Sequence, residues 1–183
     1  MLLKLFFYTA LLLIAILGYR SYASASSSLT IGDDAPNFKL NDTKGNSHTL
    51  SDYKGQYLVL YFYPKDDTPG CTKEACHFRD DMAQLEKLGA KVIGISVDSR
   101  ESHEKFAEKY HLPFTLLADT DGKVANSYQS LTNLYVTKIA KRHTFLIDPD
   151  GKIKKIYTNV NVSSHSQQII DDLKTIQNNK LSK

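Results

Sequence analysis

The feature that most constrains the fold of this chain is the run YLVLYFY at residues 57–63, which carries no charge and no alternation of polar and apolar side chains. A strand with one face in water would alternate, so this run predicts a central strand that is buried on both faces. Pro64 follows the run and ends it. Such a strand needs a layer of structure on each side, which favours an α/β fold.

Strands and helices alternate along the rest of the chain. Residues 90–97 (AKVIGISV) predict a second buried strand, and helices are expected from Thr68 to Gly89 and at residues 99–110. This alternation predicts a mixed central sheet flanked by helices on both sides, with an N-terminal β-hairpin. The other expected elements are that hairpin at residues 37–50, a short strand at 114–119, a second hairpin at 143–158 and a closing helix at 163–177.

The first 25 residues differ from the rest of the chain. Lys4 precedes an uncharged apolar run at residues 5–17, and ASA at residues 23–25 fits a signal-peptidase site. This predicts a secretory signal peptide cut after about Ala25, followed by one domain at residues 26–183. The alternative is an uncleaved membrane anchor, although the run is shorter than the roughly 20 residues that a spanning helix needs. We expect a periplasmic or secreted domain, or an anchored one that faces the same oxidising compartment.

The charge of the domain argues against nucleic acid as a partner. The chain carries +3 from 23 basic and 20 acidic residues, and the leader contributes Lys4 and Arg20 without any acid, which leaves +1 for the domain. A surface that binds nucleic acid needs a strong basic excess. We therefore expect no nucleic-acid partner, and membrane contact only if the leader is retained.

Both cysteines of the chain lie in one short segment, TPGCTKEACHF at residues 68–78. Thr68 is a good N-cap and Pro69 fits the first helical position, so Cys71 is expected in the first turn of a helix. That helix follows a central strand, and the carboxyl edge of the strands is where open α/β sheets place their sites. The free N–H groups and the dipole of a helix N-terminus favour a thiolate, which predicts that Cys71 is a nucleophile.

Cys76 lies five residues beyond Cys71. In an intact α-helix two such Cα atoms are roughly 8–9 Å apart, whereas a disulfide needs less than about 7 Å. A bond between them requires local unwinding, which suits a transient disulfide better than a permanent one. The alternative is a pair of buried cysteines that do not react. Two cysteines are too few for a disulfide-rich scaffold or a four-sulfur zinc site, and we expect no metal.

The segment FYPKDDTPGCTKEACHFRD at residues 62–80 closely resembles the active-site motif of peroxiredoxins, in particular that of the bacterioferritin comigratory protein, or peroxiredoxin Q, subfamily. Its most specific part is Pro-x-x-x-Thr-x-x-Cys, present here as Pro64, Thr68 and Cys71. The resemblance extends from about residue 29 to near the C-terminus. It implies a thioredoxin-like fold and a cofactor-free thiol peroxidase that reduces hydrogen peroxide and organic hydroperoxides.

The resemblance also implies a role for each residue of the motif. Cys71 matches the peroxidatic cysteine, which peroxide oxidises to a sulfenic acid, and Cys76 matches the resolving cysteine on the same helix. Arg142, in KRHTFLID, matches the active-site arginine. Thr68 is expected to hydrogen-bond the thiolate or the attacked oxygen, and Pro64 to shield the sulfur from water. The implied reductant is thioredoxin or a similar dithiol protein, and resolution within one helix implies a monomer.

A copper carrier of the Sco type is the alternative from another functional class. Such proteins share the fold and an N-terminal anchor, and they bind copper through two cysteines and a distant histidine. Their cysteines are four apart, however, and lack the Pro-x-x-x-Thr context. The six histidines of this chain are scattered, and we expect them mostly on the solvated surface, with His143 the one near the site.

The leader makes a direct prediction about the mature protein. We expect an N-terminus near Ser26, because the uncharged run and the ASA site precede it. Intact-mass measurement of the natively expressed protein tests this prediction. An intact Met1 in the membrane fraction would instead show an anchor, and an intact chain in the cytosol would contradict both interpretations.

Overall fold

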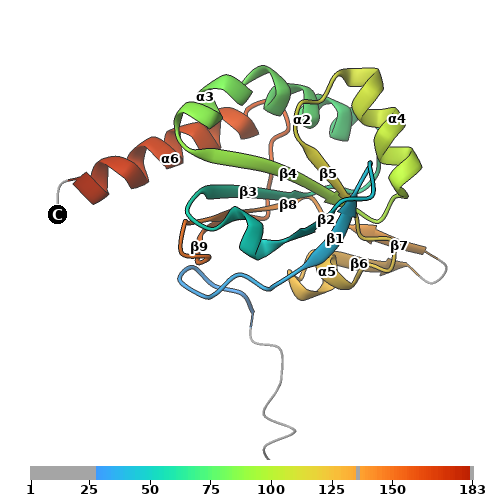
Figure 1. Cartoon of the computed structure of the whole chain (residues 1–183), viewed down its shortest axis with the longest axis horizontal. Coiled ribbons are helices and arrows are strands. Elements are labelled where there is room, and N and C mark those ends of the chain that lie inside the picture. The colour runs from blue at the N-terminus through green and yellow to red at the C-terminus, as the bar shows by residue number, and fades with distance from the viewer. Residues whose placement is uncertain (1–27, 135–136, 182–183) are drawn as a thin grey trace, which may run out of the picture.

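The computed structural model describes residues 28–134 and 137–181, and the expected leader lies outside them. Its main feature is a seven-stranded sheet in the order β2-β1-β5-β4-β3-β8-β9 (Figure 1). The β3–β4 and β4–β5 pairs are parallel and the other pairs are antiparallel, which confirms the mixed sheet. Its strands are β1 (Lys39–Asp42), β2 (Ser47–Thr49), β3 (Tyr57–Phe62), β4 (Ala90–Ser96), β5 (Thr115–Ala118), β8 (His143–Ile147) and β9 (Ile153–Tyr157).

Strand β3 is the predicted central strand, and all six of its residues are buried. Its odd-numbered residues lie in one hydrophobic core and its even-numbered residues in another, one on each face of the sheet. The lack of alternation in the sequence therefore has the expected cause. Both faces of the strand are covered, so both sets of side chains must be apolar or aromatic.

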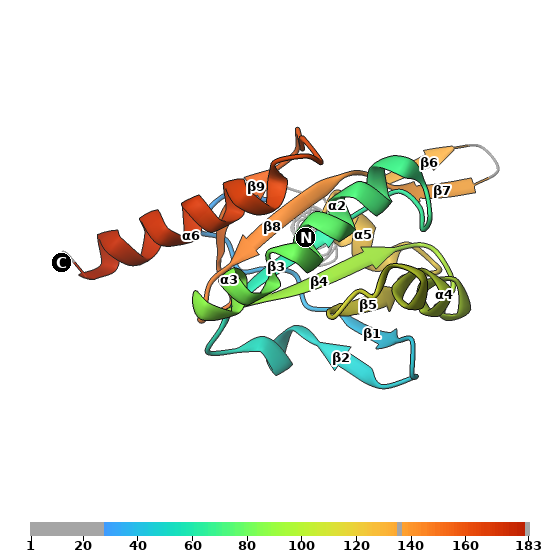
Figure 2. The same ribbon diagram turned by 90° about the horizontal axis from the view of Figure 1, so that it is seen from above.

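The two faces of the sheet are covered unequally. Helices α2, α3, α4 and α6 lie over one face, and α5 lies over the other (Figures 1 and 2). Phe78 of α2 and Phe106 of α4 anchor the first core, and Val124 of α5 enters the second. Helices on both faces are thus confirmed, although α5 was not predicted. The helices are α2 (Pro69–Asp80), α3 (Met82–Lys87), α4 (Arg100–Tyr110), α5 (Lys123–Ser127), α6 (His165–Leu181) and the 3₁₀ turn η1 (Leu50–Tyr53).

The single helix expected from Thr68 to Gly89 is divided in two at Asp81. The backbone of Asp81 has ψ 2°, far from the value near −42° that continues an α-helix. Its carboxylate accepts a hydrogen bond from the Ser166 hydroxyl of α6 at 2.6 Å. This contact fixes the bend against α6, and Leu85 of α3 is then fully buried. Apolar spacing alone continues through the bend, so the sequence did not reveal it.

A second small sheet, β6 (Leu131–Leu134) with β7 (Thr137–Ala140), was not predicted. The two antiparallel strands extend away from the main sheet (Figure 2). Gln129 just before them has φ 53°, which turns the chain into the hairpin. The hairpin ends two residues before Arg142, so it belongs to the surroundings of the site described below.

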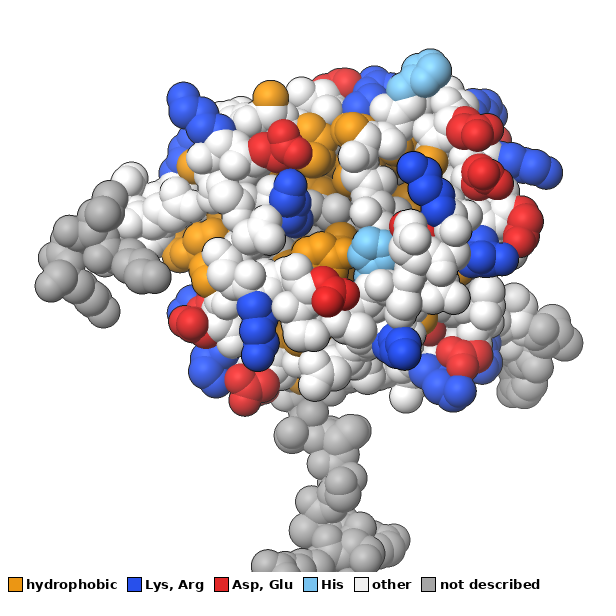
Figure 3. Space-filling view, viewed as in Figure 1, with side chains coloured by type: hydrophobic (Ala, Val, Ile, Leu, Met, Phe, Trp, Pro, Cys, Tyr) orange, Lys and Arg blue, Asp and Glu red, His pale blue; other side chains and the backbone are white. Residues whose placement is uncertain are grey.

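The surface agrees with the small net charge of the domain. Basic and acidic side chains are interspersed over the face shown in Figure 3, without a continuous basic area. Among the described residues, none of the helices combines the length and apolar character that crossing a bilayer requires.

The expectation that the histidines are mostly solvated is wrong for two of them. His103 is 0% exposed and His165 is 1% exposed. Nε2 of His165 lies 2.8 Å from the Thr144 hydroxyl, and its ring packs against Phe78 and Tyr157. Burial lowers the pKa of His165 to about 4, since the charged form would lose its hydration. The protein therefore holds a neutral imidazole under α2.

This buried histidine predicts a specific loss of stability in acid. The unfolded chain binds a proton at His165 near pH 6.5 and the folded protein only near pH 4, so the stability is complete above pH 6.5 and is lost as the pH falls toward 4. The loss is up to about 3 kcal/mol, since one pKa unit corresponds to about 1.4 kcal/mol. In urea titrations, the gap between wild type and His165→Gln should shrink by that amount between pH 7 and pH 4. The exposed His111→Asn is the matched control, and an equal pH profile for wild type and His165→Gln would contradict the prediction.

Candidate active site

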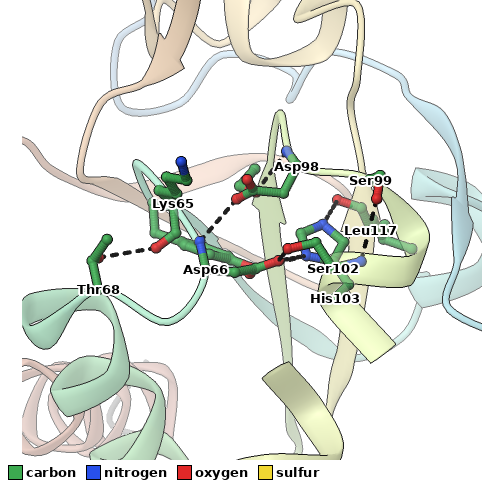
Figure 4. A network of polar contacts seen from close by, with 10 residues as sticks. Lys65, Asp66, Thr68, Asp98, Ser99, Ser102, His103 and Leu117 are labelled. Atoms are coloured by element: carbon green, nitrogen blue, oxygen red, sulfur yellow. Dashed lines mark hydrogen bonds and ion pairs between the residues drawn. The ribbon is translucent and has the colours of Figure 1, made fainter. Parts of the chain in front are cut away.

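Cys71 lies in the first turn of α2, at the carboxyl end of β3, as predicted, and only 2% of its surface is exposed. Thr68 is the N-cap residue and Pro69 the first helical residue. Among the described residues, however, the Thr68 side chain accepts no N–H from the helix. Its hydroxyl donates instead to the Lys65 carbonyl at 3.0 Å (Figure 4). The N–H groups around Cys71 are therefore not used by a capping side chain and can face an anion.

Arg142 contacts the sulfur directly. Its Nη2 donates to Sγ of Cys71 at 3.2 Å, and Nη1 pairs with the Glu74 carboxylate. The register explains how residues 71 positions apart meet: His143 of β8 pairs with Phe62 at the end of β3, so Arg142 lies next to the loop that leads into α2. A permanent cation in this position favours the thiolate form of Cys71.

Gly70 makes room for this approach. A Cβ atom built on Gly70 would lie 3.3 Å from Nη2 of Arg142, closer than most Cβ contacts. A larger residue at position 70 would require the guanidinium to shift by a few tenths of an ångström. Glycine thus serves here for space, since its φ is not in the left-handed region.

Glu74 is a site residue that the sequence analysis missed. It is 1% exposed, and its Oε1 has no hydrogen-bond partner in the described part of the chain. Burial raises the pKa of Glu74 to about 7, while Arg142 favours the charged form. The signal in the sequence was the spacing of three residues from Cys71, which places both side chains on one helical face. Arg142 therefore lies between two acidic groups, one of which changes charge near neutral pH.

The remaining residues that the sequence analysis predicted for the site are Pro64, Cys76 and His143. Pro64 is partly buried in the loop between β3 and α2, and Cys76 is partly buried further along α2. Both cysteines are free thiols on an intact helix, as the spacing argument expected. His143, expected near the site, directs Nδ1 toward the Ser130 hydroxyl at 3.1 Å rather than toward the sulfur.

Comparisons with known proteins identify related sequences. The model of the AhpC/TSA family matches residues 31–156. The chain is 46% identical over 150 residues to a putative peroxiredoxin bcp of Coxiella burnetii, a match that covers 80% of this chain and 99% of that one. It is 44% identical over 157 residues to peroxiredoxin Bcp of Bacillus subtilis, covering 80% and 96%.

Solved structures of related proteins also superpose on this fold. Peroxidoxin BcpB of Mycobacterium tuberculosis superposes with a TM-score of 0.77 at 35% identity, over 81% of this chain and 98% of that one. The PrxQ of Xylella fastidiosa gives the same score and identity over 83% and 99%. The Sco-type alternative finds no support in these matches. Within residues 28–134 and 137–181, no three His, Cys, Asp or Glu side chains are grouped so that they could hold a metal ion.

The raised pKa of Glu74 predicts a stability change in the opposite direction from that of His165. Between about pH 4.5 and pH 7 the folded protein keeps a proton on Glu74 that the unfolded chain has released, so the stability falls as the pH rises. Relative to Glu74→Gln, wild type should lose roughly 1–3 kcal/mol of unfolding free energy over this range. Urea titrations at pH 5 and pH 8 measure it. Glu86→Gln, on the exposed surface of α3, is the control, and parallel pH profiles for wild type and Glu74→Gln would refute the assignment.

Proposed function

The chain belongs to the AhpC/TSA family, within its Bcp and peroxiredoxin Q group, and is a thiol peroxidase; on this basis we propose that Cys71 is its peroxidatic cysteine and Cys76 its resolving cysteine. The observation that carries the proposal is the Arg142 hydrogen bond to Sγ of Cys71 at the N-terminus of α2. A thiolate, a fixed cation and free backbone donors are together what attack on a peroxide requires.

In the first step the Cys71 thiolate attacks the terminal oxygen of the peroxide. The O–O bond breaks, the sulfur is oxidised to a sulfenic acid, and the departing oxygen takes up a proton to leave as water or an alcohol. Arg142 and the N–H groups of Gly70 and Cys71 stabilise the negative charge on that oxygen as it forms. No cofactor is needed, because the sulfur supplies both electrons.

Thr68 and Pro64 shape the space that the peroxide enters. The hydroxyl hydrogen of Thr68 is used by the Lys65 carbonyl, so its oxygen is left as an acceptor. It can accept a hydrogen bond from the O–H of a hydroperoxide and thereby orient the O–O bond. Of the two roles expected for Thr68 from the sequence, we therefore propose contact with the peroxide and not donation to the thiolate. Pro64, which has no N–H, covers the sulfur without attracting water.

In the second step the Cys76 thiol attacks the sulfenic acid, forming the disulfide and releasing water. The helix observed here holds the two thiols free, so its first turns must unwind before they can meet. A dithiol protein of the thioredoxin type then reduces the disulfide by exchange. Because both sulfurs belong to one chain, a monomer suffices for the whole cycle.

We also propose that the substrates include organic hydroperoxides and that the protein is exported. A solved Xanthomonas campestris relative, 34% identical with a TM-score of 0.70, is described in terms of alkyl peroxide reduction. Export is supported by the leader at residues 1–25. In that location the reductant is a periplasmic or lumenal dithiol protein, since cytosolic thioredoxin is not available there. If the leader is not cleaved, it would instead anchor the same domain to the surface of the membrane.

Replacing Cys76 by serine separates the two steps and tests the proposal. Cys76→Ser should still consume one equivalent of peroxide and stop at the sulfenic acid, which intact-mass measurement detects. It should over-oxidise in excess peroxide and lose turnover with a protein dithiol, because nothing traps the acid. Cys71→Ser is the control and should do neither. Full turnover by Cys76→Ser would show that Cys76 is a bystander and that the protein is a one-cysteine peroxidase.

A further inference from the structure

A buried polar cluster connects the loop between β3 and α2 to α4 (Figure 4). Its centre is Asp66, a loop residue that is 7% exposed. Oδ1 of Asp66 accepts from the Tyr63 hydroxyl at 2.7 Å, and Oδ2 accepts from Ser102 Oγ at 2.7 Å and faces His103 Nδ1 at 2.8 Å. We call this group the Asp66 cluster; its members are Tyr63, Asp66, Ser96, Asp98, Ser102 and His103.

His103 completes the cluster from inside α4. Its side chain is 0% exposed, and its Nε2 lies 3.2 Å from the Leu117 carbonyl of β5, which can only accept. Both ring nitrogens of His103 thus lie within hydrogen-bonding distance of oxygen atoms on other elements. Asp66 and His103 are therefore joined by a fully buried polar contact. A buried polar group without a partner is costly, so the two side chains hold each other in one arrangement.

The backbone of the loop is held as well. The Asp66 N–H donates to Oδ2 of Asp98 at 2.8 Å, and the Ser96 hydroxyl donates to the same oxygen at 2.7 Å. Ser96 ends β4, so the carboxyl ends of β3 and β4 are joined through these contacts. Tyr63 after β3, Asp98 after β4 and two residues of α4 thus bond to Asp66 directly, and β5 joins the cluster through His103.

The next residue, Asp67, bonds to the C-terminal end of α4. Asp67 has φ 55°, a left-handed conformation that is uncommon for aspartate. Its carboxylate accepts from Lys109 Nζ at 2.7 Å and 2.8 Å and from the Tyr110 hydroxyl. Two successive aspartates thus fasten the loop along the whole length of α4. Thr68 follows directly and is itself bonded to Lys65 of the same loop.

We propose that the Asp66–His103 pair positions residues 64–68 over Cys71, and that His103 is a positioning residue for the reaction with peroxide. Pro64 and Thr68 belong to the held segment, whereas Arg142 and the turns of α2 that carry both cysteines lie outside it. The pair therefore fixes the walls of the peroxide site without touching the sulfur. It also lies before the helical turns that must unwind, so the segment keeps its place while the disulfide forms. This inference rests on the proposed peroxidase function.

The test compares two rate constants of Cys71 in each variant. His103→Gln should lower the second-order rate constant with hydrogen peroxide by roughly tenfold or more, because a displacement of about 1 Å can cost on the order of 100-fold. Tyr63→Phe, which removes one hydrogen bond to Asp66, should lower it by a smaller factor. Alkylation by iodoacetamide should stay near the wild-type rate in both, because it needs the thiolate and no oriented oxygen. A general loosening of the fold would change alkylation too.

Tyr157→Phe is the matched control, because the Tyr157 hydroxyl also donates to an aspartate, Asp172, at 2.7 Å, but far from the loop. It should leave both rate constants unchanged. If His103→Gln does not fold, Tyr63→Phe and Ser102→Ala decide the question. Wild-type peroxide rates in these variants, or a parallel fall of both rate constants, would overturn the positioning role alone. A wild-type protein that is inert to peroxide would overturn the proposed function and this inference with it.

Discussion

The whole arrangement depends on β3 being buried on both faces at the centre of the sheet. Because the strand is central, it has a neighbour on each side, parallel β4 and antiparallel β8. The first neighbour brings the Asp66 cluster to the carboxyl end of β3, and the second brings Arg142 to the same end. The chain leaving β3 then enters α2 with Cys71 in its first turn. One strand thus brings together the Cys71 thiol, the Arg142 cation and a fixed loop from distant parts of the sequence.

Arg142 links the two acidic groups of this site, the Cys71 thiol and the Glu74 carboxyl. It donates to the Cys71 sulfur and pairs with Glu74, so two acidic groups share one guanidinium that is itself half-buried. On the proposed role of Cys71, the reaction with peroxide replaces the thiolate beside Arg142. The Glu74 carboxylate takes no part in that step, and its contact with the guanidinium holds Arg142 in place while the sulfur changes. Burial raises the pKa of Glu74 to about 7, so the charge of Glu74 can change near neutral pH.

The sequence predicted correctly those elements that depend on residues close together in the chain. The apolar run of β3, the Thr68–Pro69 helix start and the alternating hairpins were each predicted from short-range pattern and confirmed, and the family resemblance led to Arg142. The pattern could not reveal Glu74 as buried, because a charged residue on a helix is usually solvated. It also missed the bend at Asp81 and the burial of His103 and His165. Each of these depends on a partner distant in sequence, respectively Ser166, Asp66 and Thr144.

The burial of Phe78 has a consequence for the speed of the enzyme. Its ring is 0% exposed and packs against Tyr61, Phe114 and His165, two positions beyond Cys76. On the proposed mechanism, unwinding that passes Cys76 and stops before Phe78 draws Cys71 and Ala75 out of the same core, while the Phe78 ring stays packed. The remaining part of α2 then provides the end from which the helix reforms. Helix formation takes about 0.1–1 μs in peptides, so the helix can reform rapidly in each turnover.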